Sequence, residues 1–288
     1  MRTCETHQRG EETMYLLKKI NLDDAWQKEQ GWNEERKSGR KFDDRKELEF
    51  WEKLAPHYSE QFNLYRDVPG LKEKISSIIG KGSYLLDLGC GSGNFTLPFS
   101  KQCREILALD FSPAMLEVLS REMKKQDIRN IRTVCSKWED FSQPCETDFV
   151  LAVNSLYRVC YMREALKKIV LYGRKGFIIV RTLLKPLLYR IYDDLNLDYH
   201  RNNDYMLMPL MLWDMGIHAD VEFMKYDRTK LYPTLASGEE EMKSDLGELT
   251  YMNFNNQLEE KFLHHCEKTE EGYLYHSERI VQVISFVK

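Results

Sequence analysis

The stretch that most constrains the fold spans residues 85–94, with the sequence LLDLGCGSGN. Together with Tyr84 its apolar half forms a run without polar alternation that stops at glycine, as a parallel strand covered on both faces does. Gly89, Gly91 and Gly93 then remove Cβ from alternate positions. The backbone can therefore take unusual dihedral angles, and a ligand can approach the main chain and the N–H groups that open the next helix.

A second strand points to a ligand that carries a ribose. Residues 105–110 form another buried run, which ends in Asp110. A carboxylate at the end of the second strand, about 20 residues beyond a glycine turn, can accept hydrogen bonds from ribose hydroxyls. Ser112 and Pro113 suit the N-cap and the first position of the following helix. The alternatives are a turn without a ligand and a solvated carboxylate.

The glycine spacing resembles the first motif of class I S-adenosylmethionine-dependent methyltransferases. The glycines follow G-x-G-x-G with Asp87 two positions ahead, whereas the dinucleotide fingerprint is G-x-G-x-x-G. The resemblance covers residues 71–182 and implies S-adenosyl-L-methionine as the cofactor, with Asp87 near its methionine moiety. The residues that it places around the cofactor are Asp87, Gly89, Cys90, Gly91, Gly93, Asp110, Phe111, Met115, Lys137, Trp138, Glu139 and Asn154.

The loop after the third strand is the adenine site that the resemblance implies. This strand spans residues 131–135, and Trp138 and Glu139 follow it. In the family an aromatic ring can stack on the adenine there, and an acidic side chain can meet its amino edge. We therefore expect Trp138 to stack and Glu139 to bind the amino edge, with a hydrophobic anchor as the alternative role of Trp138.

The fourth strand spans residues 148–153. In the family, the segment that follows this strand faces the transferred methyl group. In amino-group DNA and protein methyltransferases it holds a polar residue, two prolines and an aromatic residue. Here Asn154 is followed by SLY, which disfavours those acceptors. Arg181, at the end of the fifth strand, suits either an anionic substrate group or a solvated exit from the strand. The residues predicted to contact the acceptor are Tyr58, Ser155, Tyr157 and Arg181.

Strands that alternate with helices predict a Rossmann-like α/β fold: a seven-stranded, mostly parallel sheet with an antiparallel last strand and helices on both faces. Residues 50–58, FWEKLAPHY, resemble the aromatic segment that precedes the family's core, where a tyrosine often lies near the cofactor. Packing anchors of an amphipathic helix are the alternative. The expected segments are a helical N-terminal lid (1–70), the S-adenosylmethionine-binding core (71–232), a helical cap insertion (233–271) and the last core strand (272–288).

No residue stands out as a catalytic base. Methyl transfer expels neutral sulfur, so alignment and the exclusion of water can supply much of the rate, whereas a protonated acceptor needs a base. His57, Tyr58 and Tyr157 are weak candidates by residue type. Tyr199, His200 and His218 qualify on the same ground alone.

Composition narrows the partners. With 42 basic and 46 acidic residues, the net charge of −4 gives no general attraction to nucleic acid or anionic membranes. The longest apolar run, residues 206–213, is far below the roughly 20 residues that span a bilayer. The seven cysteines lack a C-x-x-C pair, which favours reduced thiols in a cytoplasmic protein and no metal site.

We therefore expect a methyltransferase with a small-molecule acceptor, no nucleic-acid or membrane partner, and an open oligomeric state. Three alternatives remain: a cofactor-binding module that performs no chemistry, an NAD-linked oxidoreductase, and metalloid methylation through Cys90 and Cys160.

Overall fold

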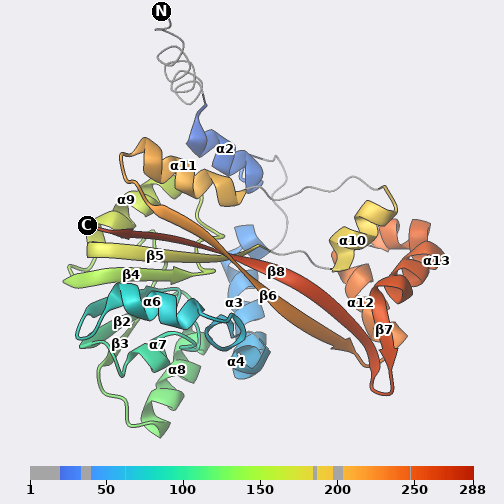
Figure 1. Ribbon diagram of the computed structural model, residues 1–288, viewed down its shortest axis with the longest axis horizontal. Helices are drawn as coiled ribbons and strands as arrows, with labels where there is room; N and C mark the ends of the chain where they lie inside the picture. The colour runs from blue at the N-terminus through green and yellow to red at the C-terminus, as the bar shows by residue number, and fades with distance from the viewer. Residues whose placement is uncertain (1–19, 34–39, 62, 184–186, 197–203, 247) are drawn as a thin grey trace, which may run out of the picture.

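The computed structural model describes residues 20–33, 40–61, 63–183, 187–196, 204–246 and 248–288 (Figure 1). Part of the predicted lid (1–19 and 34–39) and the candidates Tyr199 and His200 therefore lie outside the described residues. An eight-stranded sheet has the order β3-β2-β1-β4-β5-β8-β6, and β7 pairs with β8. The strands are β1 (Tyr84–Leu88), β2 (Glu105–Asp110), β3 (Ile131–Cys135), β4 (Thr147–Val153), β5 (Gly173–Leu183), β6 (Asp220–Tyr232), β7 (Cys266–Thr269) and β8 (Gly272–Val287).

The sheet has the direction pattern that the sequence predicts. Strands β1 to β5 pair in parallel, and β8 runs antiparallel to both β5 and β6. The predicted fold class is therefore confirmed, with one addition. The short strand β7 lies where only helix was expected, because a hairpin at Gly272, whose φ is +138°, folds it back onto β8.

Helices cover both faces of the sheet because its strands are apolar on both sides. Leu86 and Leu88 of β1 pack with α9 and α11 in one buried cluster, while Leu85 packs with α6 and α8 in another. The helices are α2 (Leu22–Glu29), η1 (Arg40–Phe42), α3 (Asp44–Leu54), η2 (Ala55–His57), α4 (Tyr58–Gln61), α5 (Leu64–Asp67), α6 (Leu71–Ile79), α7 (Thr96–Phe99), α8 (Pro113–Lys125), α9 (Met162–Tyr172), α10 (Leu187–Asp194), η3 (Asp204–Met206), α11 (Leu207–Asp214), α12 (Leu235–Leu246) and α13 (Glu248–His265).

Side-chain caps fix the start of two helices near the site. Ser112 accepts a hydrogen bond from the backbone N–H of Met115 at 3.3 Å, with Pro113 at the first position of α8, as predicted. Asp43 caps α3 by accepting from the N–H groups of Arg45 and Lys46 at 3.0 and 3.2 Å. The Asp43 cap therefore sets where α3 begins above the sheet.

Strands β6 and β8 are the longest of the sheet. They contain 13 and 16 residues, so that β8 fills the span predicted for the last core strand, and both continue beyond the sheet as a two-stranded ribbon toward α10, α12 and α13 (Figure 1). A third buried cluster, which includes Tyr232, Phe262 and Tyr275, joins this ribbon to those helices. Within the described part of the chain, none of the helices has the length and apolar character needed to cross a bilayer.

Candidate functional site

The glycine turn between β1 and α7 uses its three glycines differently. Gly89, Gly91 and Gly93 have φ angles of +70°, +55° and +93°, which side chains rarely adopt. A Cβ at Gly89 would lie 2.2 Å from Cβ of Ser155, and one at Gly93 would lie 2.6 Å from Cδ1 of Leu119. At Gly91 the nearest atom would be Cε1 of Tyr58 at 3.8 Å. A Cβ at position 89 or 93 would therefore collide with packed side chains, whereas one at Gly91, which lines both cavities, would make only an ordinary van der Waals contact.

Two carboxylates flank this turn. The Asp110 carboxylate accepts hydrogen bonds from the N–H groups of Gly91 and Ser112, both at 2.8 Å. Burial raises its pKa although these hydrogen bonds act in the opposite direction. Asp87 is buried and accepts a hydrogen bond from the Thr96 hydroxyl at 2.5 Å. Burial, aided by the charge of Asp110, raises the pKa of Asp87 to about 7.

Two cavities meet above this turn. The first has a volume of about 760 Å³ and the second about 1150 Å³. They share a wall formed by Trp51, Tyr58, Gly89, Gly91, Val153, Asn154, Ser155 and Tyr157. We call these eight residues the shared wall.

The structure gathers nearly all predicted site residues at these cavities. The first cavity is lined by the predicted cofactor residues Gly89, Gly91, Asp110, Phe111, Met115, Lys137, Trp138, Glu139 and Asn154. Asp87 and Cys90 line the second cavity, as do all four predicted acceptor residues, Tyr58, Ser155, Tyr157 and Arg181. Gly93 is not among the residues described as lining either cavity, because it packs against Leu119 and Leu97.

Trp138 does not fit the expected stacking role. Its ring is 5% exposed, donates its Nε1–H to the carbonyl oxygen of Ala165 at 3.2 Å, and lies against Phe141 with ring centroids 6.0 Å apart. The alternative expectation, a hydrophobic anchor, describes these surroundings. Glu139 is exposed at the rim of the first cavity. Phe111 is half-buried and also lines this cavity, with its ring centroid 5.4 Å from Nζ of Lys137.

The polar residues beyond β4 and β5 have partners of their own. The Asn154 side chain donates to the Thr182 hydroxyl at 2.9 Å and accepts from the Thr182 N–H at 2.8 Å, and its φ is +51°. It therefore links the ends of β4 and β5. Arg181 is paired with Asp204 at 2.6 Å, and its Nη1 is buried without a hydrogen-bond partner. Arg181 is thus a buried ion pair beside the second cavity and not a solvated exit residue.

None of the described candidates has the properties of a catalytic base. Tyr157 donates its hydroxyl to Glu47, and burial together with that carboxylate raises the pKa of Tyr157. Burial and the charge of Asp110 raise the pKa of Tyr58. His57 and His218 are exposed, and neither is among the residues described as lining a cavity.

Metalloid chemistry at a thiolate is also disfavoured. Burial, with the nearby carboxylates, raises the pKa of Cys90 well above its ordinary value, which keeps the thiol protonated. Among the described residues, no group of three or more His, Cys, Asp or Glu side chains is placed to hold a metal ion.

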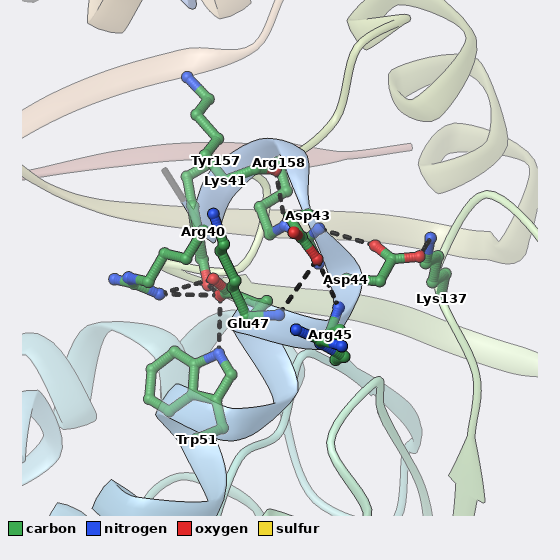
Figure 2. Close-up of polar contacts among 11 residues, drawn as sticks. Arg40, Lys41, Asp43, Asp44, Arg45, Glu47, Trp51, Lys137, Tyr157 and Arg158 are labelled. Carbon is green, nitrogen blue, oxygen red and sulfur yellow. Dashed lines mark hydrogen bonds and ion pairs between the residues drawn. The ribbon is translucent and has the colours of Figure 1, made fainter. Parts of the chain in front are cut away.

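Residues 40–61, here called the covering segment, extend across the first cavity (Figure 2). Glu47 of α3 is fully buried and accepts hydrogen bonds from Tyr157, from Nε1 of Trp51 at 2.8 Å, and from Arg40 at 2.8 and 2.9 Å. The segment is therefore fixed to the loop after β4 through one carboxylate.

A second carboxylate of the covering segment contacts two core loops. Asp44 is bonded to Lys137 of the loop after β3, and to Nη2 of Arg158 of the loop after β4 at 2.7 Å (Figure 2). The hydrogen bond from Lys137 has the largest effect on the pKa of Asp44 and lowers it. The hydrogen bond from Arg158 also lowers this pKa, while burial acts in the opposite direction, so that the pKa stays below its ordinary value. The predicted adenine-loop residue Lys137 thus pairs with the covering segment.

Sequence reasoning missed Asp44, Glu47 and Arg158. Asp44 and Glu47 lie in the charged run DDRKELE, and Arg158 is a lone charge after Tyr157, and neither pattern separates a buried charge from a solvated one. A weak signal was present: Glu47 precedes Trp51 by one helical turn, so a lone acid shares the aromatic face of α3.

Comparisons with known proteins agree with this geometry. Residues 85–175 match a family model described as a methyltransferase domain. The chain is 30% identical over 87 residues to the "Probable cobalt-precorrin-6B C(15)-methyltransferase (decarboxylating)" of Methanocaldococcus jannaschii, covering 28% of this chain and 48% of that protein. It is 38% identical over 64 residues to a tRNA/tmRNA (uracil-C(5))-methyltransferase of Neisseria meningitidis, covering 22% and 18%.

A solved structure shows the same fold at low identity. The YcgJ protein from Bacillus subtilis superposes with a TM-score of 0.51 and 16% identity, covering 76% of this chain and 97% of that one. The chain spans about half the length of the first curated relative. Residues 85–175 therefore match a methyltransferase domain, within the Rossmann-like fold described above.

Proposed function

We propose that this protein transfers the methyl group of S-adenosylmethionine to a small-molecule acceptor held in the second cavity. The shared wall is the observation that carries the proposal. The first cavity lies beside Asp110 and Phe111, and the second lies beside Arg181. Both cavities are lined by the same eight residues, which include Gly91 and Tyr58. A sulfonium bound in the first space would thus lie next to an acceptor in the second.

The cofactor assignments follow from the contacts at the glycine turn. Asp110 already fixes the N–H groups of Gly91 and Ser112, and it borders the first cavity, where a ribose could donate hydroxyls to its remaining acceptor positions. Gly91 lines both cavities, and a Cβ there would lie in ordinary van der Waals contact with Cε1 of Tyr58 at 3.8 Å, so a side chain at this position would enter the space that the cofactor occupies in this proposal. When bound, the cofactor supplies an electrophilic methyl group on sulfur.

The covering segment acts as a lid in this proposal. It contributes Asp43, Asp44, Glu47 and Tyr58 to the first cavity, and contacts from Glu47 and Asp44 hold it to the core. Closing a site expels water and fixes the reacting groups, which is where a displacement at sulfonium can gain most of its rate. Because Tyr58 and Tyr157 remain protonated, we propose catalysis by alignment, with Ser155 and Tyr58 orienting the acceptor.

A small acceptor is favoured over nucleic acid by the shape of the second cavity. Its lining comes from the covering segment, the strand ends, α10 and the β6–β8 ribbon, so it is bounded on several sides. The similarity to the RNA-modifying relative is confined to 64 residues.

The deciding measurement is a calorimetric titration of the chain with S-adenosylhomocysteine, with NAD as the control. We expect micromolar binding of the first and none of the second. Turnover is then tested with methyl-labelled S-adenosylmethionine and a panel of small acceptors. Cofactor binding without transfer to any acceptor would favour a sensor or an assembly subunit, and NAD binding would instead support the oxidoreductase alternative.

A further inference from the structure

We infer that the second cavity recognises its acceptor through an anionic group, a carboxylate or a phosphate, bound by Arg228 and Arg279 with Arg190 nearby. The inference rests on the proposed function, in which the molecule bound in the second cavity is the methyl acceptor. All three arginines line the second cavity, and they come from β6, β8 and α10.

The strand register places the first two arginines side by side. Tyr226 pairs with Arg279, and Arg228 pairs with Ser277, in the antiparallel β6–β8 ladder. Paired residues share a face, so Arg228 and Arg279 are diagonal neighbours on one face, with Cα atoms about 7–8 Å apart. Long arginine side chains can converge on one anion across that distance.

The electrostatics of two tyrosines agree with this register. Arg279 and Arg228 both act to lower the pKa of Tyr226, against a larger effect of burial. Arg190 and Arg279 act in the same way on the pKa of Tyr275, which lies on the same face of β8 as Arg279. All three guanidinium groups therefore influence this one face of the ribbon.

The lining of the second cavity is rich in arginine. Its charged residues are Arg40, Arg181, Arg190, Arg228 and Arg279 together with Asp87, Asp193 and Asp204. Arg40 is paired with Glu47, and Arg181 with Asp204. Arg190, Arg228 and Arg279 lie at the end of the cavity formed by the ribbon and α10.

The surroundings of this face add detail. Asp67 lies near Arg228 and is itself paired with Arg66 at 2.7 Å. In the described part of the chain Arg279 makes no ion pair, and its Nε donates a hydrogen bond of 3.4 Å to the Ser277 hydroxyl. Burial, followed by the charge of Arg279, lowers the pKa of Arg228.

Like charges on one half-buried face are unfavourable unless an anion lies between them. A carboxylate or phosphate would accept paired hydrogen bonds from the planar guanidinium groups and remove that repulsion. Tyr189, Tyr205 and Phe223 line the same cavity. The acceptor class that fits is a compact molecule with an apolar or aromatic body and one acidic group.

The position of the arginines sets how such a molecule would lie. The β6–β8 ribbon continues past the ends of β4 and β5, whereas the shared wall lies over β1 and β4 (Figure 1). The acidic group would bind at the ribbon, so the opposite end of the molecule would point toward Tyr58 and the first cavity.

Isothermal titration of the protein saturated with S-adenosylhomocysteine tests the inference. The probes are phenylacetate, phenyl phosphate and, as a neutral counterpart, phenylacetamide. The double variant Arg228→Gln/Arg279→Gln is compared with wild type and with Arg129→Gln. Arg129 is a matched control because its side chain is 84% exposed and paired with Asp127 on the far side of β3.

We expect an acidic probe to bind wild type and Arg129→Gln, and to bind at least about tenfold more weakly to the double variant. Added salt should weaken the same binding, since ion pairs are screened. The preference between phenylacetate and phenyl phosphate identifies the acid. The inference would be overturned if the double variant bound the acidic probes as tightly as wild type, or if wild type bound phenylacetamide as tightly as the acidic probes. It would also be overturned if wild type bound neither acidic probe at concentrations up to about 10 mM. S-adenosylhomocysteine affinity is measured first, so its loss would count against the proposed function instead.

Discussion

Tyr157 donates its hydroxyl hydrogen to Glu47, and this contact joins the loop after β4 to helix α3 (Figure 2). The same carboxylate accepts from Arg40 and from Trp51. One fully buried acid therefore gathers donors from η1, from its own helix and from the core. Trp51 and Tyr157, two residues of the shared wall, are therefore bonded to the same buried carboxylate.

Replacing Glu47 with Gln should destabilise the protein. The glutamine amide has the shape of the glutamate side chain, but its NH₂ group would face the hydrogen-bond donors of Trp51 and Tyr157. The substitution also removes the negative charge that pairs with Arg40. We expect a loss of about 3 kcal/mol in the free energy of unfolding, measured by urea denaturation. Glu49→Gln is the control, because Glu49 is on the same helix with a side chain 54% exposed. Equal effects of the two substitutions would mean that the buried contacts carry no special weight.

Asp110→Ala should weaken S-adenosylhomocysteine binding by about 1.5–3 kcal/mol, the loss of hydrogen bonds to a charged acceptor. The structure adds that alanine also releases the N–H groups of Gly91 and Ser112. Asp110→Asn, which retains an acceptor oxygen, should lose less. Calorimetry gives the dissociation constants, with the exposed Asp127→Ala as control. An unchanged constant in Asp110→Ala would remove this residue from the ribose role.

The three glycine environments predict three different outcomes for alanine. Gly82 has a φ of +73°, and no atom lies within 4 Å of the Cβ that alanine would add. Gly82→Ala therefore measures the cost of a positive φ alone, a loss of about 1 kcal/mol in the free energy of unfolding. Gly89→Ala adds a collision with Ser155 and should lower the melting temperature much further. Gly91→Ala should match Gly82→Ala in stability yet lose cofactor affinity.

The glycine series is read by thermal unfolding and by S-adenosylhomocysteine titration. If Gly91→Ala binds like wild type, the open space beside Gly91 is not where the cofactor lies. The bulkier Gly91→Val should abolish binding altogether, because both extra methyl groups enter the same space.

Asp87 predicts a pH dependence of stability in the cofactor-free protein. Its pKa rises from 3.8 to about 7, chiefly through burial, so the folded state holds a proton that the unfolded state releases between those values. Stability should fall as the pH rises through this window. Asp87→Asn removes the penalty and should be the more stable protein at pH 8, by at most about 4 kcal/mol.

The Asp87→Asn advantage should shrink as the pH falls from about 7 to 3.8 and disappear below that value, where both states are protonated. Urea denaturation at several pH values checks this, with Asp127→Asn as the control. An advantage that does not change with pH would show that the buried carboxyl does not titrate as described.

Local patterns were enough to predict the sheet and the glycine turn. The run from Tyr84 to Gly93 fixes a strand and its turn through residue type alone, and Ser112 with Pro113 fixes the start of α8. Asp110 follows a strand whose burial is visible in its composition. These features depend on neighbours in sequence.

The missed features depend on neighbours in space. Whether Trp138 faces the cavity or the core is decided by the carbonyl of Ala165, which is distant in sequence. Glu47 is buried because Tyr157 meets it, and no local pattern encodes that meeting. The pairing of β6 with β8 is likewise a contact between residues that are distant in sequence.

The place of β8 between β5 and β6 also has a consequence for biosynthesis. Residues 220–232 leave the ribosome before the strand that pairs with them has been made. Until residues 272–287 emerge, β6 has no hydrogen-bonded neighbour in the sheet and β5 has an unprotected edge. The nascent chain must therefore keep two long strands from pairing with other molecules, and folding of the arginine-bearing ribbon waits for nearly the whole sequence.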